Sequence, residues 1–190
     1  MKCLLCENFS LTHICSSCQE TFLTPSLYKR RLSNGIEVIS FYKYNDIKDL
    51  LHTKHTYLGF YIYNILAKLS FKKFSDEFNL NYHVVSLGIN DHVKDGYSHT
   101  AILNKYLKSK TIKPLFSKLR AKNSISYSGK SKEFRIMNPR AFTLHDISEK
   151  RVILVDDIIT TGTTLNEACQ LLKQNKKEVL FCLTLADAHD

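Results

Sequence analysis

The stretch RVILVDDIITTGTTLNEA, residues 151–168, decides the fold. Four aliphatic residues, Val152–Val155, lead into two aspartates, Asp156 and Asp157. Such an uninterrupted apolar run is typical of a strand buried on both faces of a parallel sheet. We expect a helix over residues 163–175 and another strand over 178–186, since the first is amphipathic and the second is apolar. The carboxyl-terminal part is therefore predicted to be a β-loop-α-β crossover in a parallel sheet.

The loop between this strand and its helix has the composition of an anion site. In open parallel sheets, ligands bind outside the carboxyl ends of the strands, where Asp156 and Asp157 stand. Backbone N–H groups, threonine hydroxyls and the positive end of the helix suit a phosphate. Gly162 lets the chain bend closely around it. We interpret the acids and the loop as a cradle for ribose 5-phosphate, and the candidate ligand residues are Asp156, Asp157, Thr160, Thr161, Gly162, Thr163 and Thr164.

Other phosphate motifs do not fit. The chain contains neither G-x-x-x-x-G-K-[ST] nor G-x-G-x-x-G, so a P-loop ATPase and a dinucleotide fold are disfavoured. A response-regulator strand can also read ILVDD, but that domain needs more chain than follows Asp156. The plainest alternative is a helix cap beside two acids with no ligand, although a run of five Thr and Gly residues exceeds what a cap needs.

Upstream, the pattern predicts further elements of an α/β domain. We expect strands over 36–44 and 82–89, a helical segment over 45–74 and a short helix over 99–109. The basic run YKRR, which follows Pro25, is interpreted as a connector. Cys169 and Cys182 stand in apolar surroundings and are expected in the core.

Cysteines at the amino terminus have the spacing of a metal site. Cys3, Cys6, Cys15 and Cys18 form C-x2-C-x8-C-x2-C. Two such knuckles can direct four thiolates toward one zinc ion, which would supply the folding energy that so short a segment lacks. The alternative is a pair of disulfides, which an intracellular setting disfavours. We predict a zinc knuckle over residues 1–24 and one larger domain over 25–190.

Composition and charge narrow the class of protein. Hydrophobic residues make up 44% of the 190, which indicates a globular protein. We find neither a membrane-length apolar run nor a signal-peptide h-region, so we expect a cytoplasmic protein. The formal net charge is +9, and residues 105–135 hold ten Lys or Arg against one acid, Glu133. This basic window favours a polyanionic partner, unless it is simply a solvated loop. Its candidate DNA-binding residues are Lys118, Arg120, Lys122, Lys130, Lys132 and Arg135.

The segment VILVDDIITTGTT resembles the phosphoribosyl-pyrophosphate (PRPP) motif of type I phosphoribosyltransferases. The resemblance implies that Asp156 and Asp157 contact the ribose 2′ and 3′ hydroxyls. It also implies that residues 160–164 hold the 5-phosphate, and that Mg²⁺ can accompany the diphosphate of PRPP.

The layout as a whole resembles the competence-protein ComF family. A four-cysteine knuckle precedes the domain, FYKYNDIKDLLHTKH is similar to the family's tyrosine, helix and lysine segment, and EFRIMNPRAF matches its Arg-x-x-Asn-x-x-Ala-Phe pattern. Departures lie on the pyrophosphate side. The chain has VVS where the family has Pro-Val-Pro, and DGYSH where it has Arg-Gly-Phe-Asn-Gln, so that Asp95 replaces an arginine. A glutamine expected near Tyr127 is missing. Ser86, Leu87 and Gly88 occupy the place of the pyrophosphate loop.

Three functions follow from these resemblances. The first is a cytoplasmic factor for natural transformation that binds single-stranded DNA and PRPP, with a competence-machinery ATPase or other DNA-processing proteins as possible partners. Lysines of the basic window would follow phosphates, and Tyr106, Phe116, Tyr127 and Phe134 could stack bases or belong to the core. The second is an active phosphoribosyltransferase of nucleotide metabolism, for which no catalytic or acceptor-binding residue is identifiable. The third is a PRPP-sensing regulator.

Overall fold

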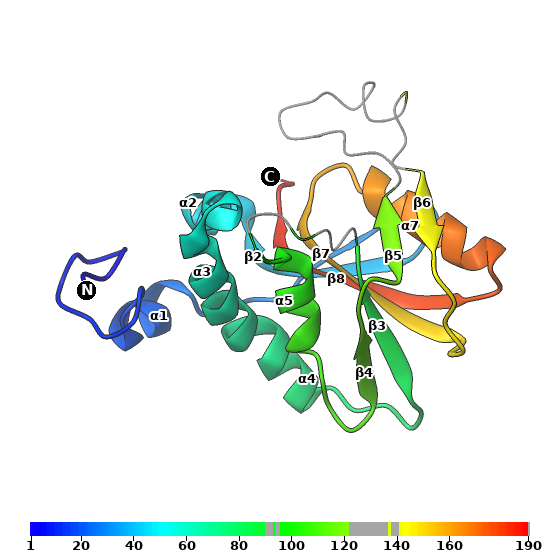
Figure 1. The fold of residues 1–190 in the computed structure, drawn as a ribbon, viewed down its shortest axis with the longest axis horizontal. Helices are drawn as coiled ribbons and strands as arrows, with labels where there is room; N and C mark the ends of the chain where they lie inside the picture. Colours follow the sequence, from blue (N-terminus) through cyan, green and yellow to red (C-terminus); the bar gives the residue numbers. More distant parts are fainter. Residues whose placement is uncertain (90–92, 94–95, 122–136, 138–140, 190) are drawn as a thin grey trace.

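The structure is a computed structural model that describes residues 1–89, 93, 96–121, 137 and 141–189. Its main feature is a six-stranded sheet with the order β1-β2-β8-β7-β3-β4, in which only the β1–β2 pair is antiparallel. Figure 1 shows the sheet between two groups of helices. This arrangement confirms the expected α/β fold with a mostly parallel sheet.

The strands of the main sheet are β1 (Tyr28–Arg31), β2 (Glu37–Lys43), β3 (Val84–Gly88), β4 (Ile112–Leu115), β7 (Arg151–Ile159) and β8 (Glu178–Asp187). A separate antiparallel pair consists of β5 (Leu119–Ala121) and β6 (Phe142–Leu144). The α-helices are α1 (Ser16–Phe22), α2 (Tyr44–His52), α3 (Tyr57–Ala67), α4 (Lys73–Glu77), α5 (His99–Lys105) and α7 (Thr163–Gln174). A 3-10 turn, η1 (Thr53–His55), separates α2 from α3, and a π-helical segment, η2 (Lys68–Lys72), joins α3 to α4.

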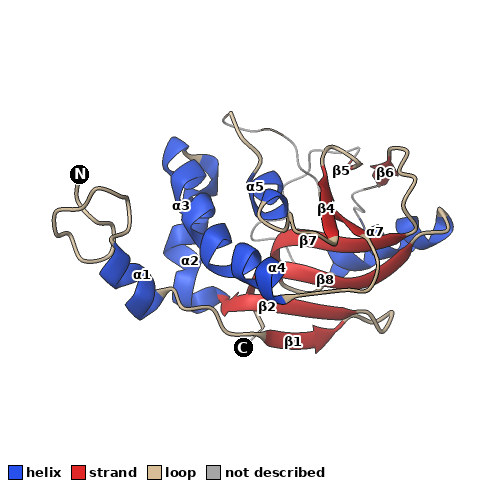
Figure 2. Cartoon of the chain, turned by 90° about the horizontal axis from the view of Figure 1, so that it is seen from below, coloured by secondary structure: helices blue, strands red, loops and turns tan. Residues whose placement is uncertain are grey.

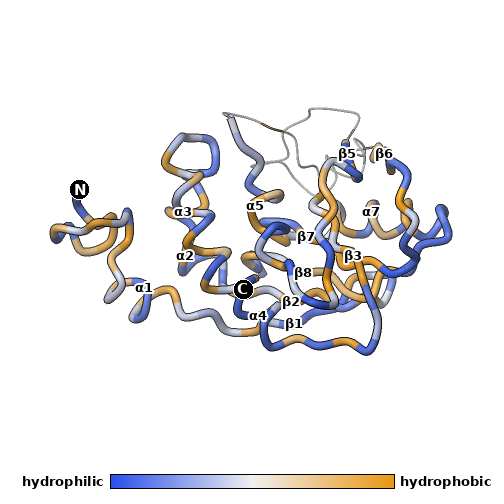
Figure 3. Tube along the Cα trace, turned by 60° about the horizontal axis from the view of Figure 1, so that its bottom comes forward, coloured by the Kyte–Doolittle hydropathy of each residue, from blue (hydrophilic) through white to orange (hydrophobic). Residues whose placement is uncertain are grey.

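Alternation along the buried strands creates three layers. Ile153 and Val155 of β7 belong to the core under α2, α3 and α5, whereas Val152 and Leu154 belong to the core under α7 and the β5–β6 pair. Successive side chains of a strand point to opposite faces, so each face of the sheet needs its own cover. Figure 2 shows the two helical groups on opposite sides of the strands, and Figure 3 shows the apolar residues along β3.

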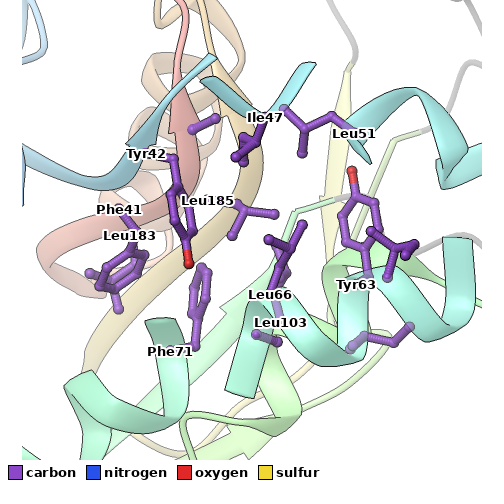
Figure 4. Packing of buried hydrophobic residues seen from close by; sticks show 14 of the residues in the cluster. Phe41, Tyr42, Ile47, Leu51, Tyr63, Leu66, Phe71, Leu103, Leu183 and Leu185 are labelled. Carbon is purple, nitrogen blue, oxygen red and sulfur yellow. The ribbon is translucent and has the colours of Figure 1, made fainter. Parts of the chain in front are cut away.

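The larger core lies between the sheet and helices α2–α5. Large aromatic and aliphatic side chains fill it without exposure to solvent (Figure 4), and its central members are Phe41, Tyr42, Leu51, Tyr63, Leu66, Phe71, Leu103, Leu183 and Leu185. Cys169 and Cys182 are buried in the second core, as expected. These two cores hold β7 rigidly, which fixes the position of the residues at its carboxyl end.

Three predictions about the elements need correction. The helix expected over 45–74 is interrupted at residues 53–56, where Thr56 has extended backbone angles. The presumed connector YKRR is strand β1, because its residues pair with 37–40 of β2. Ser86, Leu87 and Gly88 lie in the buried strand β3 and not in a loop, since they pair with both β4 and β7.

Candidate functional site

The two acids of residues 156–157 lie at the same strand end but face different surroundings. β7 continues through Ile159, because it pairs with β8 as far as Asp187. Consecutive positions in a strand point to opposite faces. Asp156 lines a depression together with Thr160–Thr164, whereas the carboxylate of Asp157 contacts Lys54 and His99. The acid pair therefore connects the loop on one side with the helical layer on the other.

The depression beside Asp156 has the composition expected of a phosphate site. It is a shallow depression open to solvent, and its lining runs without a gap from Ile158 to Leu165. The loop ends at Gly162, which has φ +76° and caps α7. A Cβ at this position would lie 2.7 Å from the Cδ2 atom of Leu32, which can move aside, so it is the positive φ that requires glycine here. The backbone N–H groups that begin a helix are available to an anion placed in this depression.

A guanidinium from the edge of the sheet holds the loop from behind. Arg30 of β1 donates a hydrogen bond to the backbone carbonyl of Thr160, and its other terminal nitrogen lies 3.4 Å from Oδ1 of Asp187. Burial lowers the pKa of Arg30, and the charge of Asp187 opposes that effect. Because this bond ties β1 to the loop that follows β7, it restricts the movement of the loop. Nothing in the sequence pattern identified this residue.

Asp157 is part of a buried charged cluster. The ammonium of Lys54 donates to Oδ2 of Asp157 at 2.8 Å, and Nε2 of His99 lies 3.4 Å from the same oxygen. Burial alone would raise the pKa of this carboxyl. The charges of Lys54 and His99 lower it by more than burial raises it, so the pKa lies well below its usual range. The neighbouring Asp157 carboxylate in turn raises the pKa of Lys54. Both charges of the pair are therefore present at neutral pH.

The backbone at the strand end is also fixed by the acids themselves. The N–H of Asp157 donates to Oδ1 of Asp156 at 2.9 Å, and the N–H of Ile158 donates to Oδ1 of Asp157 at 2.8 Å. Each carboxylate thus accepts the next backbone N–H along the chain. These bonds restrict both side chains to one orientation relative to the loop.

The amino-terminal cysteines meet as their spacing predicted. The four sulfur atoms of Cys3, Cys6, Cys15 and Cys18 all lie within 4.8 Å of one another, and those of Cys6 and Cys15 are 3.8 Å apart. A tetrahedral zinc site with Zn–S bonds of about 2.3 Å places its sulfurs about 3.8 Å apart. The cluster therefore has the dimensions of a four-thiolate zinc site.

Hydrogen bonds and charge at this cluster also suit a cation. The N–H of Cys15 donates to Sγ of Cys3 at 3.3 Å, and this bond is the main reason why the pKa of Cys3 falls to about 6. Burial, with the neighbouring thiols, raises the pKa of Cys18 to about 12. Four sulfurs this close cannot all ionise without a positive charge between them. A metal ion would supply that charge, so the donor set fits zinc.

The basic window is only partly described. Lys118 donates to the carbonyl of Asp146 at 2.8 Å, while Arg120 lies exposed on β5. Lys113 pairs with Glu149 at 3.2 Å. The candidates Lys122, Lys130, Lys132 and Arg135 lie outside the described residues. So do Asp95, Tyr127, Phe134 and Asn138, the asparagine of the Arg-x-x-Asn-x-x-Ala-Phe pattern.

The aromatic candidates differ in their surroundings. Tyr106 packs against the core and donates from its hydroxyl to Asn64 at 3.1 Å, so it is not placed as a surface for stacking. Phe116 is exposed. Within the part of the chain that the structure describes, no helix combines the length and apolar character needed to cross a membrane.

Comparison with known proteins gives a match over the carboxyl-terminal part. The family model described as "Phosphoribosyl transferase domain" matches residues 117–190. Adenine phosphoribosyltransferase of Homo sapiens is 47% identical over 38 residues, which cover 20% of this chain and 21% of that protein. Adenine phosphoribosyltransferase of Stochomys longicaudatus is 45% identical over 38 residues, with the same coverage. The chain thus matches about a fifth of the length of these relatives.

Solved structures with distant similarity carry related names. A crystal structure of an adenine phosphoribosyltransferase has a TM-score of 0.44 at 16% identity, covering 90% of this chain and 89% of that one. A hypoxanthine phosphoribosyltransferase from Staphylococcus aureus has a TM-score of 0.39 at 21% identity, covering 66% and 62% of the two chains.

These similar proteins do not carry the name of the ComF family, so that resemblance stays a prediction. The family match covers the segment that supplies β7, the loop of residues 160–164, α7 and β8. Residues 117–190 therefore match a phosphoribosyltransferase domain model, and the chain has the mostly parallel α/β fold predicted from its sequence.

Proposed function

We propose that this protein binds PRPP, or another 5-phosphoribosyl compound, at residues 156–164. The observation that carries the proposal is the depression at the end of β7, where Asp156 and Thr160–Thr164 line one continuous surface. The loop and the start of α7 would hold the 5-phosphate. Asp156 and Asp157 would accept hydrogen bonds from the ribose hydroxyls, and Mg²⁺ would accompany the diphosphate.

Geometry favours a rigid cradle. Arg30 holds the carbonyl of Thr160, and the backbone N–H groups of Asp157 and Ile158 fix the two carboxylates. A preformed site loses little conformational entropy when its ligand binds. A phosphorylated ribose would therefore meet acceptors and donors that are already in place.

The experiment is calorimetric titration of PRPP into the wild type and into the double variant Asp156→Ala/Asp157→Ala. Each lost hydrogen bond to a charged group is worth roughly 1.5–3 kcal/mol, so the affinity of the double variant should fall at least about tenfold. Equal affinities would show that the ligand does not use these acids.

For the cellular role, we propose a cytoplasmic factor for natural transformation that also binds single-stranded DNA. The support is the resemblance of the whole layout to the ComF family and the excess of cations in residues 105–135. The zinc knuckle over 1–24 and the domain over 25–190 would be its two parts. Exposed Arg120 and Phe116 have the chemistry to contact phosphates and bases.

An active phosphoribosyltransferase is the second candidate, and the 38-residue match to adenine phosphoribosyltransferases favours it. A PRPP-sensing regulator would need neither DNA binding nor turnover. Release of pyrophosphate from PRPP that depends on an added nucleobase would identify the transferase. Salt-dependent binding of oligonucleotides would separate the transformation factor from the regulator.

A further inference from the structure

The turn between α2 and α3 brings a lysine to the acid pair from a distant part of the chain. Lys54 lies in η1, and its ammonium is the donor 2.8 Å from Oδ2 of Asp157. The side chains of Lys54 and Asp157 are 24% and 11% exposed, so water screens this pair only partly. The contact ties the helical layer to the end of β7.

Neighbouring residues build the turn for this contact. The hydroxyl of Tyr97 donates to the carbonyl of Lys54 at 2.7 Å and lies 3.3 Å from that of Thr56. Gly59 of α3 makes room, because a Cβ there would lie 2.1 Å from the Tyr97 hydroxyl and 2.2 Å from the carbonyl of Thr53. The turn is therefore packed on both sides, and its backbone aims Lys54 at the strand end.

A buried carboxylate needs such a partner. Asp157 is 8% exposed, and burial favours the protonated, neutral form of a carboxyl. A protonated carboxyl has fewer and weaker acceptor sites than a carboxylate. The positive charge of Lys54 thus opposes protonation of Asp157, which would reduce the ability of this side chain to accept hydrogen bonds.

Several other ionisable groups face Asp157 from the surrounding elements. His99 of α5 is the nearest of them, and its ring lies 5.6 Å from that of Tyr63, measured between centroids. Among the described residues, the groups besides Lys54 whose charges act on this cluster are His99 of α5, Tyr63 of α3, Tyr44 of α2, Tyr97 and Asp156 of β7 itself. The imidazole is the one that titrates near neutral pH in model compounds, so a test must remove it.

We infer that Lys54 is the positioning residue of the ribose-binding acids, which keeps Asp157 ionised and oriented from behind. The inference rests on the proposed function for the ligand, but the charge role itself can be measured without any ligand. Lys54 is not assigned a contact with the ribose. It acts through Asp157, whose backbone N–H in turn holds Asp156.

The first measurement is thermal unfolding of Lys54→Met between pH 4 and pH 8, in a His99→Gln background. Without the ammonium, the folded-state pKa of Asp157 should rise above its unfolded value, so protonation stabilises this variant as the pH falls. With Lys54 present, the folded-state pKa is depressed, and ionised Asp157 stabilises the fold throughout this range. The melting temperature of the Lys54→Met variant should therefore lie furthest below that of its His99→Gln parent at pH 8, and the difference should shrink toward pH 4. Lys54→Arg, which keeps the charge, should recover at least part of it.

The matched control is Lys72→Met, which removes an exposed ion pair with Asp76 from the same helical layer. Its effect should be small and should depend little on pH in this range. If the deficit of Lys54→Met is instead the same at every pH, Lys54 contributes packing alone and the inference is overturned.

The second measurement is the affinity for PRPP in the same variants. Lys54→Met should bind at least about tenfold more weakly than its parent at pH 7, which corresponds to about 1.4 kcal/mol, and its deficit should grow as the pH falls. At each pH, the affinity of the variant is divided by that of its parent. This ratio cancels the titration of the ligand's own phosphates, which affects both proteins alike. Unchanged affinity in Lys54→Met would overturn the positioning role. A wild type that binds no PRPP, with the pH-dependent stability still present, would instead refute the proposed function and leave the charge role standing.

Discussion

Replacing Gly59 by alanine tests whether the turn that carries Lys54 is as tightly packed as the structure indicates. The new Cβ would lie 2.1 Å from the Tyr97 hydroxyl and 2.2 Å from the carbonyl oxygen of Thr53. The second neighbour is backbone and cannot rotate away, so the turn or helix α3 has to shift. We therefore expect a destabilised protein in which Lys54 no longer reaches Asp157 at hydrogen-bond distance.

The magnitude follows from three contributions. Overpacking a core costs roughly 1–3 kcal/mol. Losing the hydrogen bond from Tyr97 to the carbonyl of Lys54 costs about 0.5–1.5 kcal/mol. Alanine in a helix interior returns about 0.5–1 kcal/mol relative to glycine. The net loss is about 0.5–4 kcal/mol, which for a chain of this size lowers the melting temperature by roughly 1–16 °C.

Thermal unfolding followed by circular dichroism measures this change. Tyr97→Phe is the control, since it removes the hydroxyl and should cost only about 0.5–1.5 kcal/mol. The double variant Gly59→Ala/Tyr97→Phe should remain less stable than Tyr97→Phe alone, because the carbonyl of Thr53 is still 2.2 Å from the added Cβ. A Gly59→Ala protein that melts at or above the wild-type temperature would refute the packing argument.

Three further outcomes are expected. Elemental analysis of the purified protein should find one zinc ion per chain. Cys6→Ser should lose this zinc but keep the circular dichroism spectrum of the larger domain. A metal-free protein with an intact knuckle structure would contradict the prediction. Arg30→Met should weaken PRPP binding at least about tenfold by releasing the carbonyl of Thr160, because a hydrogen bond to a charged group is worth roughly 1.5–3 kcal/mol. Calorimetry that finds wild-type affinity would exclude that role. Charge reversal at Lys118, Arg120 and Lys122 should weaken the binding of single-stranded DNA to the same extent for all sequences. In fluorescence anisotropy, this binding should also depend less on the salt concentration. Binding equal to that of the wild type would indicate that the basic window is a solvated loop.

The carboxyl-terminal unit could be predicted because its signals are local. An apolar run, a threonine and glycine loop, and an amphipathic segment follow one another within residues 151–175, and the structure gives β7 and α7 there. The strand ends two residues later than the aspartates, at Ile159. Pairing with Asp187 of β8 determines that end, and no feature of the first segment reveals it.

The elements that were missed depend on partners elsewhere in the chain. Residues 28–31 look like a basic connector, yet they pair with β2, and cations are common on an edge strand that must avoid further pairing. The break at 53–56 contains neither glycine nor proline. It is stabilised by Tyr97, some forty residues away, and its position is decided by that tertiary contact.

The site itself shows how far a motif can be interpreted without its surroundings. The sequence presents Asp156 and Asp157 as equivalent acids, but their neighbouring positions in β7 give their side chains opposite directions. Asp156 borders the depression of the phosphate loop, and Asp157 accepts the ammonium of Lys54 from the other layer. A carboxylate that is buried on one side and bonded to its neighbour's backbone on the other can transmit a change in the helical layer to the loop. If the cradle binds PRPP as proposed, a shift of the 53–56 turn would therefore change its affinity, although that turn lies about a hundred residues earlier in the chain.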